Sequence, residues 1–199
     1  MPASHSASPA SHPASRSTLF LNPVQLIDYT RFVAAEVLAG GYPYVRYDES
    51  RRWHQRLYRD RRVDLWLISW LPSQGTQLHD HGGSAGAFTV LAGELSEAVH
   101  ASRANSAGGS LLERTRRAGE SIGFGRHYVH DVRNLGDRPA VSVHAYSAPL
   151  TSMTYYDLDP AGRLTALLTL ATEDPEPALT LPGRGEPALT RPGRGEPAA

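Results

Sequence analysis

The chain has 199 residues, and its 20 Lys and Arg balance its 20 Asp and Glu, so the formal net charge is zero. This balance argues against a dedicated nucleic-acid binder, and no apolar run reaches the roughly 18–20 residues that span a bilayer. The N-terminal MPASHSASPASHPASRS has no apolar signal core, so we expect a cytoplasmic protein. With no cysteines, disulfides, thiolate metal ligands and a cysteine nucleophile are excluded, and any metal would be bound by His, Asp or Glu.

The two ends of the chain have compositions that do not support a packed core. Residues 1–18 are rich in Ala, Ser and Pro, and we expect them to be disordered. In the last segment, 173–199, EPALTLPGRG (176–185) is followed by EPALTRPGRG (186–195). Two copies are too few for a solenoid, so we expect a flexible tail, with a partner-docking segment as the alternative. One domain is predicted over 19–172.

This domain begins with a helix and continues with strands. Asn22 is a candidate N-cap, Pro23 fits the first helical position, and Gly40 and Gly41 follow the last apolar turn. Short segments rich in β-branched or aromatic residues then predict strands. They are 62–70, 87–93, 94–101, 110–118, 127–134, 140–146 and 152–158. The segment 164–171 fits a helix or a strand. This order predicts an all-β jelly-roll barrel with a short N-terminal helical segment.

Two histidines in QLHDHGG form the first candidate site. In an extended segment residues two apart share a face, so His79 and His81 are expected to project together and Asp80 to the opposite side. Two neutral imidazoles on one face are the beginning of a transition-metal site. His130, in the strand-like HYVHDVRN, is the candidate third ligand. In SVHAY, Ser142, His144 and Tyr146 alternate and share a face, which indicates a relay of a hydroxyl, an imidazole and a phenol.

The order and spacing of these segments resemble the two motifs of the cupin superfamily. HDH is followed by Gly93 twelve residues after His81, and the second motif has Gly119, His130 and Asn134. HDHGGSAGAF, HDVRN and SVHAY together resemble the bacterial thiol dioxygenases of the cysteine dioxygenase type I family, over about residues 20–160. The resemblance implies a cupin jelly-roll β-barrel, or double-stranded β-helix. It also implies an Fe(II) site of His79, His81 and His130, with Tyr146, His144 and Ser142 as catalytic residues.

Two departures from related patterns bear on the metal site. Many cupins have a carboxylate ligand four to five residues after the HxH pair, where this chain has Ala85 and Gly86. The resemblance implies a three-histidine site without carboxylate, as in cysteine dioxygenases. Vertebrate-type members cross-link a cysteine near that position to the tyrosine that Tyr146 matches. This chain has no cysteine, and its bacterial relatives also lack the cross-link.

The resemblance implies that an arginine in 51–62 binds the substrate carboxylate. Arg56 aligns best, with Tyr146 as a second substrate contact, and Arg52, Arg59 and Arg62 are alternatives. Similar 3-mercaptopropionate dioxygenases have a glutamine at that position, and Gln55 is adjacent to Arg56, so a one-residue shift in alignment would change the expected substrate.

The resemblance implies an Fe(II) enzyme that uses O2 to convert L-cysteine into cysteine sulfinate, and we expect it to be a monomer. Its partners would be a small thiol and O2, with neither nucleic acid nor membrane. The alternatives are a dioxygenase for 3-mercaptopropionate or another small thiol, and a non-catalytic cupin that binds a metal or a ligand.

Overall fold

The computed structural model of the chain describes residues 20–41, 45–102 and 108–175. Helix α1, Pro23–Leu38, comes first in this part of the chain. Ten strands follow: β1 His54–Arg59, β2 Asp64–Trp70, β3 Ala85–Ala92, β4 Glu94–Ser102, β5 Gly109–Arg117, β6 Ser121–Phe124, β7 His130–Arg133, β8 Ala140–Ser147, β9 Ser152–Leu158 and β10 Leu164–Ala171. The prediction of a mostly β fold with one N-terminal helix is confirmed. The tails expected at 1–18 and over most of 173–199 lie outside the described residues.

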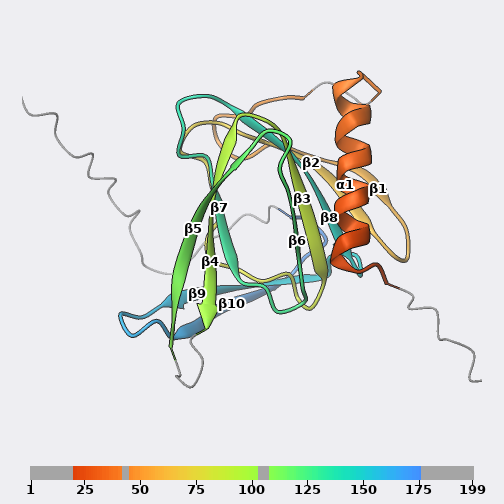
Figure 1. The fold of residues 1–199 in the computed structure, drawn as a ribbon. Coiled ribbons are helices and arrows are strands. Elements are labelled where there is room, and N and C mark those ends of the chain that lie inside the picture. Colours follow the sequence, from red (N-terminus) through yellow and green to blue (C-terminus); the bar gives the residue numbers. More distant parts are fainter. Residues whose placement is uncertain (1–19, 42–44, 103–107, 176–199) are drawn as a thin grey trace, which may run out of the picture.

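The strands form an antiparallel barrel-like fold. One sheet has the order β1-β2-β8-β3-β6, a second has β5-β4-β7, and β9 and β10 form a hairpin. In Figure 1 the second sheet lies across from the first, and the β9-β10 hairpin crosses one end. Helix α1 packs on the outer side of the first sheet, against β3, β8 and β6.

The start of α1 follows from its sequence. The Asn22 side chain accepts a hydrogen bond from the Gln25 backbone N–H, and the Gln25 side chain accepts one from Asn22 N–H, which completes a capping box. After the C-cap Ala39, Gly40 has a φ of +82°, a left-handed conformation that suits glycine. The predicted helix boundaries are therefore confirmed.

Strand β2 shows why the first sheet has two apolar faces. All seven of its residues are buried. Leu65 and Leu67 belong to the cluster between the sheet and α1, whereas Trp66, Ile68 and Trp70 belong to the cluster inside the barrel. Alternate residues of a strand point to opposite faces, so one strand contributes to both cores.

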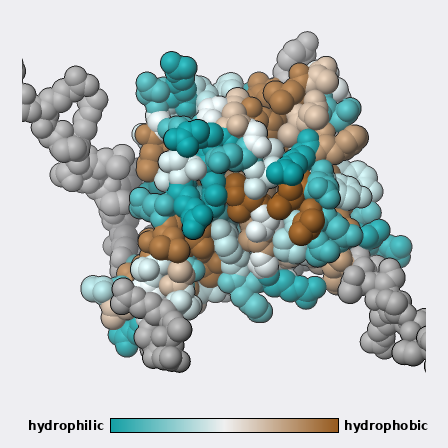
Figure 2. Space-filling view, in the orientation of Figure 1, coloured by the Kyte–Doolittle hydropathy of each residue, from teal (hydrophilic) through white to brown (hydrophobic). Residues whose placement is uncertain are grey.

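The outer side of α1 carries apolar side chains as well as polar ones. Figure 2 shows apolar atoms among the hydrophilic ones on the face of the molecule seen in Figure 1. The large apolar side chains most exposed along the helix are Val24, Phe32 and Leu38. No helix in the described ranges has the length and hydropathy that crossing a membrane requires.

Candidate metal centre

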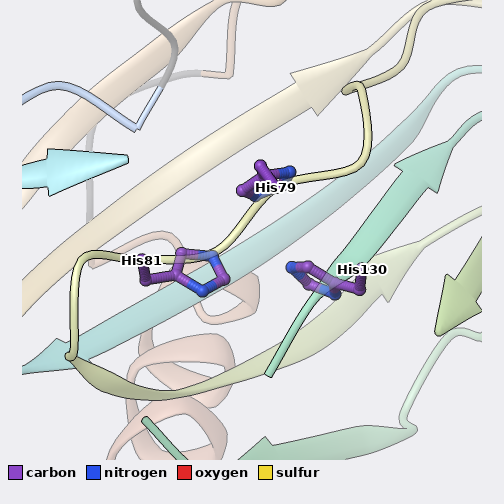
Figure 3. Close-up of side chains that lie close together, drawn as sticks. All are labelled: His79, His81 and His130. Atoms are coloured by element: carbon purple, nitrogen blue, oxygen red, sulfur yellow. The ribbon is translucent and has the colours of Figure 1, made fainter. Parts of the chain in front are cut away.

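Three histidines meet inside the barrel. His79 and His81 lie in the loop between β2 and β3, and His130 begins β7. His79 and His130 form an isolated antiparallel bridge with two backbone hydrogen bonds, His79 N–H to His130 O (2.9 Å) and His130 N–H to His79 O (3.0 Å). In Figure 3 the three rings point toward one another. Their potential ligand nitrogens all lie within 4.8 Å of one another, and each residue is buried.

Asp80 points away from the histidines and holds their loop to β9. Its Oδ2 accepts a hydrogen bond from the Tyr156 hydroxyl (2.6 Å), and its Oδ1 accepts from the backbone N–H of Gly82 (2.9 Å) and Thr154 (3.3 Å). The expected alternation of His79, Asp80 and His81 is therefore present. The backbone around His79 forms isolated bridges, including one to Tyr155, instead of a continuous strand.

Two of the three imidazoles are oriented by hydrogen bonds at Nδ1, so Nε2 is the nitrogen of each ring that remains available to a metal ion. His79 Nδ1 lies 2.7 Å from the Gln77 carbonyl oxygen, which can only accept, so this nitrogen carries the hydrogen. His130 Nδ1 lies 3.0 Å from Glu97 Oε1 and donates in the same way. In both rings Nε2 is therefore the nitrogen with a free lone pair.

The protein environment keeps the histidine cluster ready for a cation. Burial, followed by the charge that neighbouring histidines would carry, holds the pKa of His79 and of His81 well below its usual value. Metal binding requires neutral imidazole, so these rings need lose no proton at neutral pH. Transition metals bind imidazole nitrogens at about 2.0–2.1 Å, so a small inward movement of the rings would bring all three into contact with one ion. The donor set fits such an ion, and among the described residues the cluster contains no carboxylate.

Glu97 on β4 contacts the candidate site and was missed by the sequence analysis. Its side chain is fully buried. Its carboxylate accepts hydrogen bonds from His130 Nδ1 and the Tyr128 hydroxyl, both 3.0 Å, and from Arg116 Nε (2.8 Å) and Nη2 (2.7 Å). Burial alone would raise the pKa of Glu97, but the bonds from His130 and Arg116 outweigh it and lower the pKa. A charged carboxylate behind a ligand histidine fixes its ring and raises its basicity.

The three residues of SVHAY that were expected to form a relay do lie on one face of β8. Trp70 Nε1 donates to Ser142 Oγ (2.9 Å), which lies 2.8 Å from His144 Nε2. His144 Nδ1 is 3.5 Å from the Tyr146 hydroxyl, and the Tyr146 ring centroid is 5.0 Å from that of His81. Trp70 only donates, so the hydroxyl hydrogen of Ser142 can be given to His144. This network therefore reaches the histidine cluster through the Tyr146 ring, and Trp70 is its fourth member.

Comparisons with known proteins place the chain in a family. Residues 39–159 match the model of the family described as Cysteine dioxygenase type I, which is more than half of the chain. The chain belongs to the cysteine dioxygenase type I family. It is 29% identical over 103 residues to a zebrafish (Danio rerio) protein described as cysteine dioxygenase type 1. That match covers 48% of this chain and 50% of the zebrafish protein, so the chain spans about half the length of this relative.

Solved structures with low overall similarity were also found. A protein from Thermus thermophilus is 22% identical with a TM-score of 0.45, and the match covers 52% of this chain and 90% of that one. A double-stranded β-helix protein from Klebsiella pneumoniae is 19% identical with a TM-score of 0.43, covering 53% and 84%. The family assignment does not depend on either likeness.

In this member of the cysteine dioxygenase type I family, Arg56 pairs with Trp66 and so lies on the face of β1 that is directed into the barrel. Its guanidinium group contacts Asp64, Glu173 and Trp66. Its Nε is 3.2 Å from the buried carboxylate of Asp64, and its Nη2 donates to the Glu173 backbone oxygen at 2.7 Å. The guanidinium carbon also lies 4.4 Å from the Trp66 ring centroid. Glu173 and Asp174, which the sequence analysis assigned to the tail, both contact β1.

Arg52, one of the alternatives to Arg56, lies nearer to the histidines. Burial and the His130 charge lower the pKa of His79 and of His144 most, and the positive charge of Arg52 lowers both further. Its guanidinium carbon is 5.0 Å from the Trp70 ring centroid, which places it beside the Ser142 end of the relay.

Gln55 points to the other side of the sheet. It pairs with Leu67, and cross-strand partners share a face. Leu67 belongs to the cluster between the sheet and α1, so Gln55 faces away from the histidines. In the register of β1 and β2, Arg56 therefore shares the inner face with Trp66, and Gln55 shares the outer face with Leu67.

Proposed function

We propose that this protein is an Fe(II)-dependent thiol dioxygenase that converts L-cysteine into cysteine sulfinate by adding both atoms of O2 to sulfur. The observation that carries the proposal is the buried cluster of three imidazoles with the Ser142–His144–Tyr146 relay beside it. Membership of the cysteine dioxygenase type I family supports the same chemistry.

The donor set favours a metal that accepts an anionic substrate. His79, His81 and His130 would hold it through neutral nitrogens, so its positive charge would remain available to a thiolate. Bound Fe(II) would supply the redox chemistry with O2 and favour the deprotonated thiol. Glu97 would hold His130 in place, and the Gln77 carbonyl would do the same for His79.

The protein's own groups would manage the proton and exclude water. Tyr146 is 4% exposed and its ring contacts that of His81, so its hydroxyl would hydrogen-bond the bound oxygen or thiol group. Burial lowers the pKa of His144 to about 3, so it stays neutral and can hold Tyr146 through Nδ1. Met153 and Tyr155 are nearly fully buried in the apolar cluster around the site and would keep bulk water out.

We further propose Arg52, in place of Arg56, as the residue that binds the substrate carboxylate. A guanidinium can form two parallel hydrogen bonds with a carboxylate. The position of Arg52, with its guanidinium carbon 5.0 Å from the Trp70 ring centroid, and the effect of its charge on His79 and His144 support this role. A thiol bound by iron and a carboxylate bound by Arg52 also describe 3-mercaptopropionate, which lacks only the amino group of cysteine.

The test is oxygen uptake by the full chain, loaded with Fe(II) without oxygen and then given each thiol. We expect turnover with L-cysteine to exceed that with 3-mercaptopropionate, and both to exceed that with cysteamine, which has no carboxylate. Arg52→Gln should raise KM for L-cysteine by about tenfold or more, since a charge-assisted bond contributes about 1.5–3 kcal/mol. The matched variant Arg56→Gln should change this KM much less.

The outcomes distinguish the candidates. Faster turnover of 3-mercaptopropionate than of L-cysteine would contradict the proposed substrate but would support thiol dioxygenation. If Arg56→Gln raised the KM for L-cysteine more than Arg52→Gln, Arg56 would be the residue that binds the substrate carboxylate. Metal binding without turnover of any thiol would refute the dioxygenase and favour a non-catalytic cupin.

A further inference from the structure

Gly86 leaves a space beside the metal centre that Phe124 fills. Gly86 on β3 pairs with Phe124 on β6 and with Tyr146 on β8, so the three positions form one row across the sheet. A Cβ atom built on Gly86 would lie 2.3 Å from Phe124 Cζ and 2.4 Å from Cε2, far inside van der Waals contact. The Phe124 ring can therefore occupy this place only because residue 86 has no side chain.

From this position Phe124 contacts two of the three clustered histidines directly. Its ring stacks on His81 with centroids 4.9 Å apart and planes 26° apart, and its centroid lies 5.3 Å from that of His130. On β6 it is 3% exposed, and it also stacks on Tyr128, whose hydroxyl donates to Glu97. Phe124 is thus next to two of the three candidate ligands.

His81 differs from the other two histidines in how its ring is held. His79 and His130 each donate a hydrogen bond through Nδ1. Among the described residues, none is recorded as forming a hydrogen bond with the His81 ring. The ring instead lies against the rings of Phe124 and Tyr146, at 4.9 and 5.0 Å between centroids. Stacked aromatic rings restrict each other's orientation.

We propose that Phe124 is a positioning residue for the metal site: it orients His81 by stacking and closes the space through which a side chain at position 86 would enter the site. The His81 ring then needs no hydrogen-bonded partner, and the donor set stays at three nitrogens. This role rests on the proposed metal site but not on the identity of the thiol.

The test is the affinity of the full chain for Co²⁺ alone, by competition with a chelating indicator, together with the visible absorption of the bound ion. Phe124→Leu, which keeps much of the apolar volume, and Phe124→Ala should each raise the Kd for Co²⁺ about tenfold or more, as outer partners of ligand histidines commonly do. Both should change the Co²⁺ absorption bands, because the position of one ligand changes. Ile122→Ala is the matched control, since Ile122 lies two residues away on the same face of β6 and also packs on the inner cluster.

A double-mutant cycle tests the space beside Gly86. Gly86→Ala should weaken Co²⁺ binding strongly in the wild-type background and much less in the Phe124→Ala background, because the methyl group would no longer displace the ring. Equal effects in both backgrounds would overturn the proposal, as would wild-type affinity and spectrum in the Phe124 variants, or an equal loss in Ile122→Ala. Wild-type protein that binds no Co²⁺ would refute the metal site together with the positioning role. Failure to oxidise thiols alone would leave both standing.

Discussion

Replacing Glu97 with glutamine removes one buried negative charge behind the metal site and changes little else in shape. The amide oxygen can still accept the hydrogen bonds from His130 and Tyr128. The amide NH2 would then face Arg116, so the two contacts of 2.8 and 2.7 Å from Nε and Nη2 would be lost. The Arg116 side chain is only 18% exposed, so water replaces these contacts incompletely.

The size of the effect follows from these contacts. Hydrogen bonds to charged groups contribute about 1.5–3 kcal/mol each, and the loss of two is partly offset by the remaining exposure of Arg116. We expect the free energy of unfolding of the metal-free protein to fall by about 3 kcal/mol. His130 also loses a charged acceptor, so the Kd for Co²⁺ should rise about 10- to 100-fold.

Urea unfolding of the metal-free protein and Co²⁺ titration measure the two effects separately. Glu94→Gln is the matched control, because Glu94 is on the same strand, is exposed, and only approaches Arg117 at 3.9 Å. It should change neither quantity measurably. A Glu97→Gln protein that unfolds and binds Co²⁺ like wild type would refute the reasoning that Glu97 supports His130.

Three further predictions concern the relay and the loop of the histidine pair. Burial lowers the pKa of His144 from 6.5 to about 3, so below pH 6.5 the unfolded chain binds a proton that the folded chain does not. His144 should therefore lower the stability of the metal-free protein, measured by urea unfolding, by up to about 1.4 kcal/mol for each pH unit between about pH 6 and pH 3, and a flat profile would contradict the burial of neutral His144. Tyr146→Phe should lower kcat for thiol oxidation about tenfold or more while leaving the Kd for Co²⁺ nearly unchanged, and an unchanged kcat would remove the hydroxyl from the chemistry. Tyr156→Phe removes the 2.6 Å hydrogen bond to Asp80 and should lower the free energy of unfolding by about 1–2 kcal/mol, whereas no loss would show that the contact does not stabilise the loop.

Much of the fold was predictable because its signals are local. Asn22 and Pro23 define the start of α1, and the apolar or alternating segments became β2, β3, β4, β5, β7 and β8 with shifted ends and β9 with the predicted ends. Two strands were missed. β1 has the polar sequence HQRLYR and is extended because it pairs with β2, and β6 has only four residues. The ambiguous segment 164–171 is strand β10, which pairs with β9 along its length.

The site was predictable where residues repeat a spacing and unpredictable where only the tertiary structure brings them together. The spacing of His79 and His81 and the alternation of SVHAY predicted side chains that do lie together. Glu97 could have been noticed, since it follows Leu95 by two residues and so shares an inward face. Arg52 lies before β1, where no strand alternation fixes its direction, and its proximity to His144 follows only from the folded chain.

The most direct test of the central claim is the product that the iron-loaded protein makes from L-cysteine under ¹⁸O2. After anaerobic loading with Fe(II), we predict cysteine sulfinate that carries two ¹⁸O atoms on sulfur, with one O2 consumed for each sulfinate formed. Formation of cystine alone, or of a sulfinate in which an oxygen comes from water, would contradict a dioxygenase at His79, His81 and His130.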